Sequence, residues 1–151
     1  MQWHRGPYTI DTDRERLDMP TIITWLQGTY WAVGRSAELI TQSWAASAVV
    51  AGVYAGAELV GWARVVTDGV VVAYLADVFI VPQHRRQGIG RWLVATVLAH
   101  PELGTVRWLL HTRDAQAFYQ GLGFVAVGPR IMERARIATG QATDVDPASG
   151  G

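Results

Sequence analysis

The sequence contains no cysteine and no lysine, and these two absences exclude several kinds of chemistry. Without cysteine there can be no disulfide, no thiolate nucleophile and no cysteine-ligated zinc. Because all thirteen residues in the lysine and arginine class are arginine, a Schiff base or a lysine nucleophile is excluded as well. The histidines do not stand at metal-ligand spacing, so we predict no metal site.

The sequence also lacks an excess of either charge and a long apolar run. Thirteen acidic residues balance the thirteen arginines, which argues against nucleic acid as a partner because phosphate backbones select a basic surface. The apolar run at residues 70–81 is too short to span a membrane and contains Asp77. Residues 1–18 lack the apolar core of a signal peptide. We therefore expect a soluble, cytoplasmic protein with no membrane partner.

Half of the 151 residues are apolar, which is enough to bury the core of one domain. Valine-rich and aromatic runs predict strands at residues 8–11, 49–54, 59–66, 71–81, 107–111 and 124–127, and a further strand from Ile131 and Met132. Helix-start signals and apolar periodicity predict helices from Asp18, from Ser36, at residues 88–100 and from Asp114. We place the domain at residues 1–137, and the small, polar, non-periodic residues 138–151 predict a disordered tail.

The connections between these elements indicate the fold class. Short turns at residues 55–58 and 67–69 join three strands into an antiparallel meander. The strand at 107–111 is reached through a helix, so it should run parallel to its predecessor. The order β-α-α-β-β-β-α-β-α-β therefore predicts an α/β or α+β domain with a mixed, mostly antiparallel central sheet flanked by helices.

Residues 81–91 read V-P-Q-H-R-R-Q-G-I-G-R and lie where a strand gives way to a helix. Gly88 and Gly90 allow the backbone to come close to an anion, and the helix N-terminus adds partial positive charge. A P-loop would need Gly-Lys-Ser/Thr and a dinucleotide-binding turn would need G-x-G-x-x-G, and neither is present. Alternatively, the glycines only open the helix and the arginines around them are solvated.

The string R-R-Q-G-I-G resembles the R/Q-x-x-G-x-G/A signature of the GNAT superfamily, the acyl-CoA-dependent N-acetyltransferases. Residues 112–124, T-R-D-A-Q-A-F-Y-Q-G-L-G-F, resemble a second signature of that family, in which a helix carries a tyrosine shortly before Gly-Phe. The order of elements also matches, and the resemblance covers residues 8–132. It implies the GNAT fold, in which the fourth and fifth strands, here 71–81 and 107–111, splay apart.

This resemblance implies acetyl-CoA as the cofactor. The amides of residues 86–91 would hold its pyrophosphate, and the neighbouring arginines would add positive charge. The pantetheine arm would pair as a pseudo-strand with the main chain near Phe79 and Val81, where a free N–H can also polarise the thioester carbonyl. The implied cofactor-binding residues are Phe79, Ile80, Val81, Arg85, Arg86, Gln87, Gly88, Ile89, Gly90, Arg91, Asp114 and Phe118.

Two residues are candidates for catalysis. Tyr119 is the candidate general acid, because a tyrosine can protonate the departing thiolate of coenzyme A; its alternative is a core-edge tyrosine beside Phe118. Asp77, the one carboxylate within a long apolar strand, is the candidate general base. Asp77 could equally accept backbone hydrogen bonds at a bulge or bind a cationic acceptor, with water removing the amine proton.

The acceptor is predicted less sharply. Residues on the side where this family binds its acceptor are mostly aromatic, namely Tyr30, Trp31, Trp62, Arg64 and Tyr74. They suggest a small-molecule amine with an apolar or aromatic body. Because no cysteine can carry an acyl intermediate, we expect a primary amine to attack acetyl-CoA directly in a ternary complex. The alternatives are a non-catalytic acyl-CoA sensor and an acetyltransferase for protein N-termini or lysines, and a homodimer is also considered.

Overall fold

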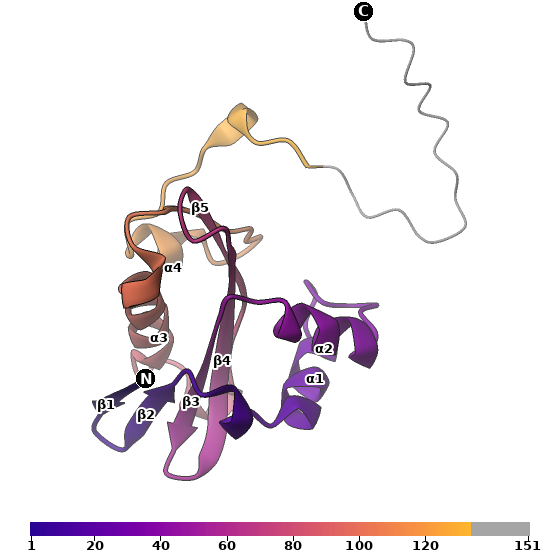
Figure 1. Ribbon diagram of the computed structural model, residues 1–151, viewed down its shortest axis with the longest axis vertical. Helices are drawn as coiled ribbons and strands as arrows, with labels where there is room; N and C mark the ends of the chain where they lie inside the picture. Colours follow the sequence, from indigo (N-terminus) through magenta and orange to yellow (C-terminus); the bar gives the residue numbers. More distant parts are fainter. Residues whose placement is uncertain (134–151) are drawn as a thin grey trace, which may run out of the picture.

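The computed structural model describes residues 1–133, which form a six-stranded mixed sheet with helices on both faces (Figure 1). Across the sheet the strands follow their order in the sequence: β1 (Gln2–Arg5), β2 (Tyr8–Asp11), β3 (Val49–Ala55), β4 (Glu58–Thr67), β5 (Val72–Ile80) and β6 (Arg107–Leu109). Neighbouring strands are antiparallel except β5 and β6, which are parallel. The predicted fold class is therefore confirmed, whereas the predicted tail at 138–151 lies outside the described residues.

The helices lie on both faces of this sheet. Figure 1 shows α1 (Met19–Gln27) and α2 (Ala37–Ala45) on one face, and α3 (Ile89–Leu98) and the short α4 (Gln116–Gln120) on the other. Single-turn 3-10 helices among the described residues are η1 (Arg14–Arg16), η2 (Pro82–His84), η3 (Pro101–Leu103) and η4 (Gly128–Arg130). None of the helices within residues 1–133 has the length and apolar character that crossing a membrane requires.

The starts of α1 and α2 follow from local sequence. The carboxylate of Asp18 accepts a hydrogen bond from the N–H of Thr21 at 3.2 Å, and Pro20 occupies the first turn of α1. The hydroxyl of Ser36 accepts one from the N–H of Leu39 at 3.1 Å and begins α2. Both predicted helix starts are confirmed, and they fix the ends of the connector at residues 28–36, which later forms a wall of the site.

Side-chain alternation along the strands divides the core into two layers. On β3, Ala51 and Val53 point toward α3 and pack in the same cluster as Leu93 of that helix. Val50, which precedes Ala51, points to the opposite face and packs with Trp62 of β4 and with the apolar sides of α1 and α2. Both faces of the central strands are therefore covered by helices.

The strands β5 and β6 separate soon after they meet. They pair only over residues 72–74 of β5 and residues 107–109 of β6, whereas β5 continues to Ile80. Between the pairs Arg64–Ala76 and Trp62–Phe79, β5 has one more residue than β4, which is a β-bulge. Asp77 lies in this bulge with a φ of 52°. The splay predicted between these two strands is therefore present, and it opens toward the carboxyl end of β5.

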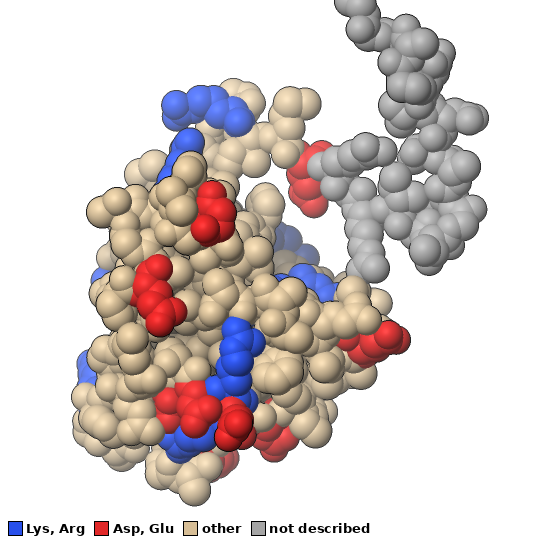
Figure 2. Space-filling model, in the orientation of Figure 1, with Lys and Arg blue, Asp and Glu red and all other residues tan. Residues whose placement is uncertain are grey.

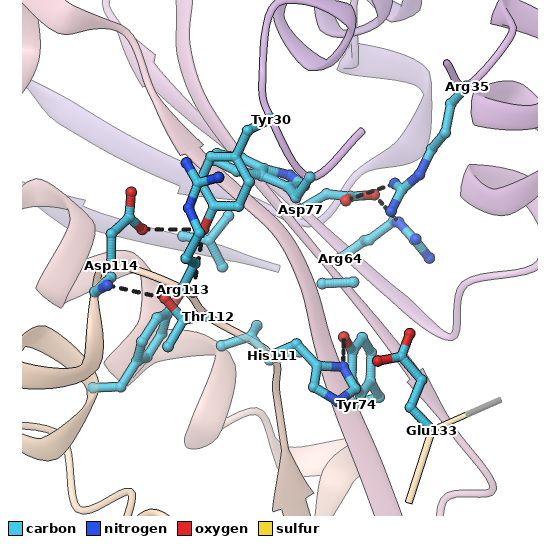
Figure 3. A pocket seen from close by; sticks show the side chains of 16 residues that line it. Tyr30, Arg35, Arg64, Tyr74, Asp77, His111, Thr112, Arg113, Asp114 and Glu133 are labelled. Carbon is cyan, nitrogen blue, oxygen red and sulfur yellow. Dashed lines mark hydrogen bonds and ion pairs between the residues drawn. The ribbon is translucent and has the colours of Figure 1, made fainter. Parts of the chain in front are cut away.

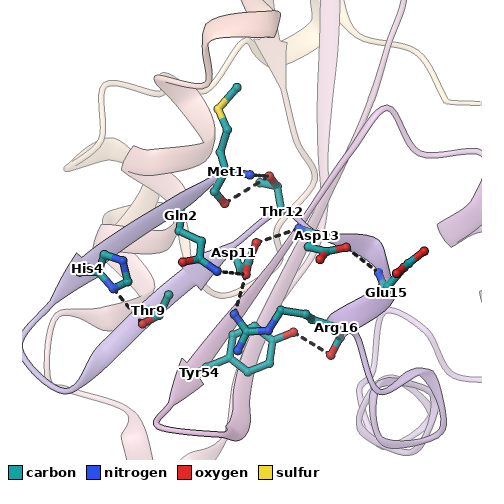
Figure 4. A network of polar contacts seen from close by, with 10 residues as sticks. All are labelled: Met1, Gln2, His4, Thr9, Asp11, Thr12, Asp13, Glu15, Arg16 and Tyr54. Carbon is teal, nitrogen blue, oxygen red and sulfur yellow. Dashed lines mark hydrogen bonds and ion pairs between the residues drawn. The ribbon is translucent and has the colours of Figure 1, made fainter.

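Strand β1 was not predicted, because its four residues are largely exposed and show no apolar alternation. A polar network around the buried Asp11 fastens it to β2 (Figure 4). The Asp11 carboxylate accepts hydrogen bonds from Gln2 Nε2 at 2.6 Å, from Arg16 Nη1 at 2.5 Å and from the N–H of Asp13 at 2.9 Å. This hairpin brings Arg5, at the end of β1, to the loop before α3.

The strand predicted at residues 124–127 is wrong, and the further strand predicted from Ile131 shows no strand residue up to Glu133, after which the chain lies outside the described residues. Residues 124–127 have no regular structure and face β6 across a cavity of about 730 Å³, so no main-chain ladder joins them to that strand. The N–H of Phe124 instead bonds the carbonyl of Tyr119 at 3.1 Å, next to the positive φ of 91° at Gly123. An apolar run becomes a strand only where a partner strand lies within hydrogen-bonding distance.

One face of the protein presents charges of both signs. On the face shown in Figure 2, acidic and basic side chains are interspersed among uncharged residues. This mixture agrees with the equal numbers of acidic and basic residues in the chain. The face in view therefore presents no broad area of one charge.

Candidate active site

A cavity of about 530 Å³ lies where β5 and β6 separate (Figure 3). Its walls are the connector between α1 and α2, the bulged part of β5, Arg64 of β4, and the loop between β6 and α4. We call it the central cavity. The polar and aromatic residues that line it include Tyr30, Trp31, Arg35, Arg64, Tyr74, Asp77, His111, Arg113, Asp114, Tyr119 and Glu133. Four of the five predicted acceptor-binding residues are among them.

Trp62 is the predicted acceptor-binding residue that the structure places elsewhere. It is 1% exposed and packs in the core between the sheet and helices α1 and α2, outside the lining of the central cavity. Trp62 and Arg64 lie two residues apart on β4 and so point to the same face of the sheet, but the helices cover only Trp62. The neighbouring Arg64 reaches the cavity instead, as predicted.

An arginine–aspartate cluster, made of Arg35, Arg64 and Asp77, forms one wall of the cavity (Figure 3). Arg35 Nη1 donates to Asp77 Oδ1 at 2.9 Å, and Arg64 Nε donates to Asp77 Oδ2 at 2.6 Å. The Asp77 side chain is 2% exposed, so its charge is balanced by these guanidinium groups rather than by water. Sequence reasoning missed Arg35, which precedes α2 and is 42 residues from Asp77 in the chain.

Tyr119 lies on α4 and lines the central cavity, as its proposed role requires. Its ring packs edge-on against Phe118, with ring centroids 4.9 Å apart, and against Phe124 at 5.8 Å. Burial, with smaller contributions from the neighbouring Tyr30 and Tyr74, raises the pKa of Tyr119 to about 12. The hydroxyl is therefore protonated throughout the neutral range, which is the state that a proton donor needs.

The connector between α1 and α2 is tied to the loop before α4 through Tyr30 (Figure 3). The Tyr30 hydroxyl donates to Asp114 Oδ1 at 3.0 Å and accepts from the N–H of Arg113 at 3.3 Å. The Arg113 guanidinium lies 3.7 Å from the centroid of the Tyr30 ring. The predicted helix cap at Asp114 is wrong: α4 begins after Ala115, whose N–H bonds Thr112 Oγ1 at 3.0 Å, because Asp114 turns to Tyr30 instead.

The glycine loop, residues 85–91, connects η2 to α3. Gly88 precedes α3 with a φ of 75°, and Arg86 has a φ of 59°. The first main-chain bond of α3 runs from the N–H of Trp92 to the carbonyl of Gly88 at 3.0 Å, so the three preceding amides lie outside the helical ladder. The loop therefore points main-chain donors and the positive end of a ten-residue helix in one direction.

Side chains from three parts of the chain fix the glycine loop. Arg85 Nε donates to the carbonyl of Ile80 at 2.7 Å, and Arg91 Nη1 donates to the carbonyl of Gly121, after α4, at 2.8 Å. Arg5 Nη1 donates to the carbonyl of Gly88 at 3.3 Å, which adds a guanidinium that sequence reasoning missed. Tyr8 on β2 completes the support, with its hydroxyl 2.9 Å from His84 Nδ1 and 3.1 Å from Gln87 Oε1.

At the end of β5, a single residue directs its main-chain groups into the opening between β5 and β6. The N–H of Val81 donates to the carbonyl of Val60 on β4 at 2.9 Å, and the Val81 carbonyl accepts from His84 at 3.0 Å. By the alternation of an antiparallel ladder, Phe79 also directs its main chain to β4, whereas Ile80 directs its own to the opening. Of the three predicted residues Phe79, Ile80 and Val81, Ile80 is therefore the one whose backbone faces the opening.

Comparisons with known proteins show what this chain is similar to. A family model described as an acetyltransferase (GNAT) domain matches residues 46–126. A candidate acetyltransferase from Gibberella zeae is 32% identical over 147 residues, covering 80% of this chain and 81% of the relative. The crystal structure of a candidate GNAT acetyltransferase from Xanthomonas campestris gives a TM-score of 0.80 at 34% identity, covering 85% of this chain and 93% of that one. A GNAT acetyltransferase from Streptococcus pneumoniae gives a TM-score of 0.68 at 25% identity, covering 87% of this chain and 98% of that one.

Proposed function

Because this chain belongs to the GNAT acetyltransferase family, we propose that it moves an acetyl group from acetyl-CoA to the primary amine of a small molecule. The observation that carries this proposal is the meeting of the glycine loop, the end of β5 and α4 at Gly90. A Cβ on Gly90 would lie 3.7 Å from Ile80 and 3.8 Å from Phe118, the neighbour of Tyr119. A loop suited to a diphosphate, an open strand and a protonated tyrosine are therefore adjacent.

The glycine loop fits the pyrophosphate of coenzyme A. Its positive-φ residues, Arg86 and Gly88, turn the main chain so that successive amides can converge on one anion. The guanidinium group of Arg5 contacts the loop, and that of Arg85, within the loop, adds further positive charge. Along the opening, the main chain of Ile80 would bind and orient the pantetheine arm as an added strand. Bound acetyl-CoA supplies a thioester whose carbonyl carbon accepts the amine.

Two side chains of the central cavity have distinct roles in this proposal. The Tyr119 hydroxyl donates a proton to the departing sulfur, for which its pKa of about 12 keeps it protonated. Asp77 holds Arg35 and Arg64 in place, because each of its oxygens already accepts a bond from one of them. The Asp77 side chain is 2% exposed and its charge is already paired with the two guanidinium groups, so we assign the amine proton to water.

The proposal is tested by calorimetric titration with acetyl-CoA, followed by measurement of thiol release with a panel of amines. We expect acetyl-CoA to bind and at least one amine to release free coenzyme A. Tyr119→Phe should lower kcat by about a hundred-fold or more without weakening acetyl-CoA binding, because only the proton donor is lost. Tyr54→Phe is the matched control: burial likewise raises the pKa of Tyr54 to about 12, but this tyrosine lies outside the central cavity.

Two outcomes would count against this function. If acetyl-CoA does not bind, the assignment of the glycine loop is wrong. If it binds but no amine releases thiol, the protein is better described as an acyl-CoA sensor. Equal rates for Tyr119→Phe and the native protein would remove Tyr119 alone from the mechanism and leave the transfer reaction intact.

A further inference from the structure

The arginine–aspartate cluster carries more positive than negative charge. Arg35 and Arg64 face one carboxylate, Asp77, so the three side chains leave one positive charge at the cavity wall. Asp114, Glu133 and Arg113 also line the cavity, but in the described part of the chain none of them forms an ion pair within 4.0 Å with a member of the cluster. Charge that is partly withdrawn from water is stabilised by a counter-ion of opposite sign. The excess therefore predicts a bound anionic group.

Arg35 is the member of the cluster placed to bind that group. The side chain of Arg64 is 11% exposed, and its Nη1 also donates to Ser47 Oγ at 3.3 Å. The side chain of Arg35 is 32% exposed, lines the cavity and is held by Asp77 through Nη1. A guanidinium has five N–H donors in a planar fork, so Arg35 has further donors with which to bind a carboxylate.

An aromatic surface lies on the same connector as Arg35. Tyr30 and Trp31 pack edge to face, with ring centroids 5.1 Å apart, and are 37% and 38% exposed. Both line the central cavity with Arg35. Exposed aromatic rings beside a positive charge suit a ligand that has an apolar body and a single negative charge.

Resting on the proposed function, we propose that the acceptor is an amino acid with an apolar or aromatic side chain, and that Arg35 binds its carboxylate. The amine would then lie on the β5 side of the cavity and the side chain against Tyr30 and Trp31. One carboxylate matches the one unbalanced positive charge of the cluster, whereas a phosphate dianion would exceed it. Arg35 is thus a specificity-determining residue that acts on the acceptor.

The test compares pairs of acceptors that differ only by the carboxylate: L-phenylalanine with 2-phenylethylamine, and L-tryptophan with tryptamine. We expect the native protein to favour the amino acid of each pair by about ten- to a hundred-fold in kcat/KM, the size of a charge-assisted hydrogen bond. Arg35→Gln should reduce this preference at least ten-fold, chiefly through KM. Arg35→Lys, which keeps the charge, should restore part of it. Comparing ratios cancels the different reactivities of the two amines.

A binding measurement separates recognition from structural damage. N-acetyl-L-phenylalanine should bind the native protein at least ten-fold more tightly than N-acetyl-2-phenylethylamine, and Arg35→Gln should abolish this difference. Arg107→Gln, an exposed arginine on β6 outside the central cavity, is the control and should leave the ratio unchanged. If Arg35 only supports Asp77, Arg35→Gln will weaken both members of a pair equally, which overturns the inference.

The failures of the two proposals can be told apart. If amines without a carboxylate are acetylated while amino acids are not, the inference about Arg35 is wrong and the acetyltransferase function stands. If acetyl-CoA binds but no compound of either kind releases thiol, the proposed function fails and the inference fails with it.

Discussion

Replacing Gly88 with alanine should disturb the glycine loop through its backbone alone. Gly88 has a φ of 75°, where an L-residue costs about 1–2 kcal/mol. An added Cβ would meet only the Arg5 guanidinium, at an ordinary contact distance of 3.5 Å, so no clash is expected. Either the loop keeps its conformation and the protein loses stability, or the loop relaxes and its amides turn away from the anion.

The loss of stability and the loss of binding free energy both come from the same backbone penalty, so together they should amount to about 1–2 kcal/mol. If all of it appears in binding, the Kd for coenzyme A rises about five- to thirty-fold. Calorimetric titration measures the binding part, and urea unfolding of the ligand-free protein measures the stability part. Acetyl-pantetheine, which lacks the pyrophosphate, should bind Gly88→Ala and the native protein equally well.

Gly56 provides a matched control for this experiment. It lies in the turn between β3 and β4 with a φ of 60° and no atom within 4 Å of an added Cβ. Gly56→Ala should therefore lower the free energy of unfolding by a similar amount and leave coenzyme A binding unchanged. If Gly88→Ala changed neither stability nor the affinity for coenzyme A, the positive φ at Gly88 would have no role in anion binding and the reasoning would be refuted.

Two further predictions concern stability. Burial raises the pKa of Asp11, but bonds from the Asp13 N–H, Arg16 and Gln2 outweigh it and lower the pKa below 3.8. The carboxylate thus stabilises the fold above pH 4. Asp11→Asn should lower the free energy of unfolding, measured in urea, by about 1–3 kcal/mol at pH 7 and by less at pH 3.5. A difference between the two proteins that does not depend on pH would contradict this. Burial, the largest cause, lowers the pKa of His100 below 6.5, so the free energy of unfolding should fall as the pH drops from about 6.5. In His100→Asn the free energy of unfolding should change less between pH 7 and pH 5; an unchanged pH dependence would show that His100 is not its cause.

The features that the sequence predicted well depend on neighbours along the chain. The caps at Asp18 and Ser36 involve residues three positions later, and the glycine loop is one continuous segment. Features that depend on distant residues were missed. Arg35 meets Asp77 across 42 residues, and Arg5 meets Gly88 across 83. No local pattern records such a meeting, since it is decided by how the connector and the first hairpin pack on the sheet.

The bulge at Asp77 explains why the main chain of Ile80, rather than that of Phe79 or Val81, faces the opening between β5 and β6. Before the bulge, the odd-numbered residues direct their main-chain groups to β6. This follows from the carbonyl of Val71, which accepts a hydrogen bond from the N–H of Arg107 at 2.9 Å. In a regular strand this pattern would carry on to Phe79 and Val81, the two residues that were predicted. The extra residue in the bulge reverses which residues of β5 direct their main chain away from β4, as a one-residue slip in register would.

The same extra residue connects the two halves of the site. Before it, Ala73 and Leu75 point into the α3 side of the core, and after it Val78 and Ile80 do so. The reversal turns the main chain of Ile80 to the opening, where Arg85 already bonds its carbonyl. The positive φ of Asp77 occurs in the same bulge, and its carboxylate meets two arginines at the cavity wall. A strand without this bulge would direct neither the Ile80 main chain to the opening nor the Asp77 carboxylate to the central cavity, so one inserted residue shapes both parts of the proposed site.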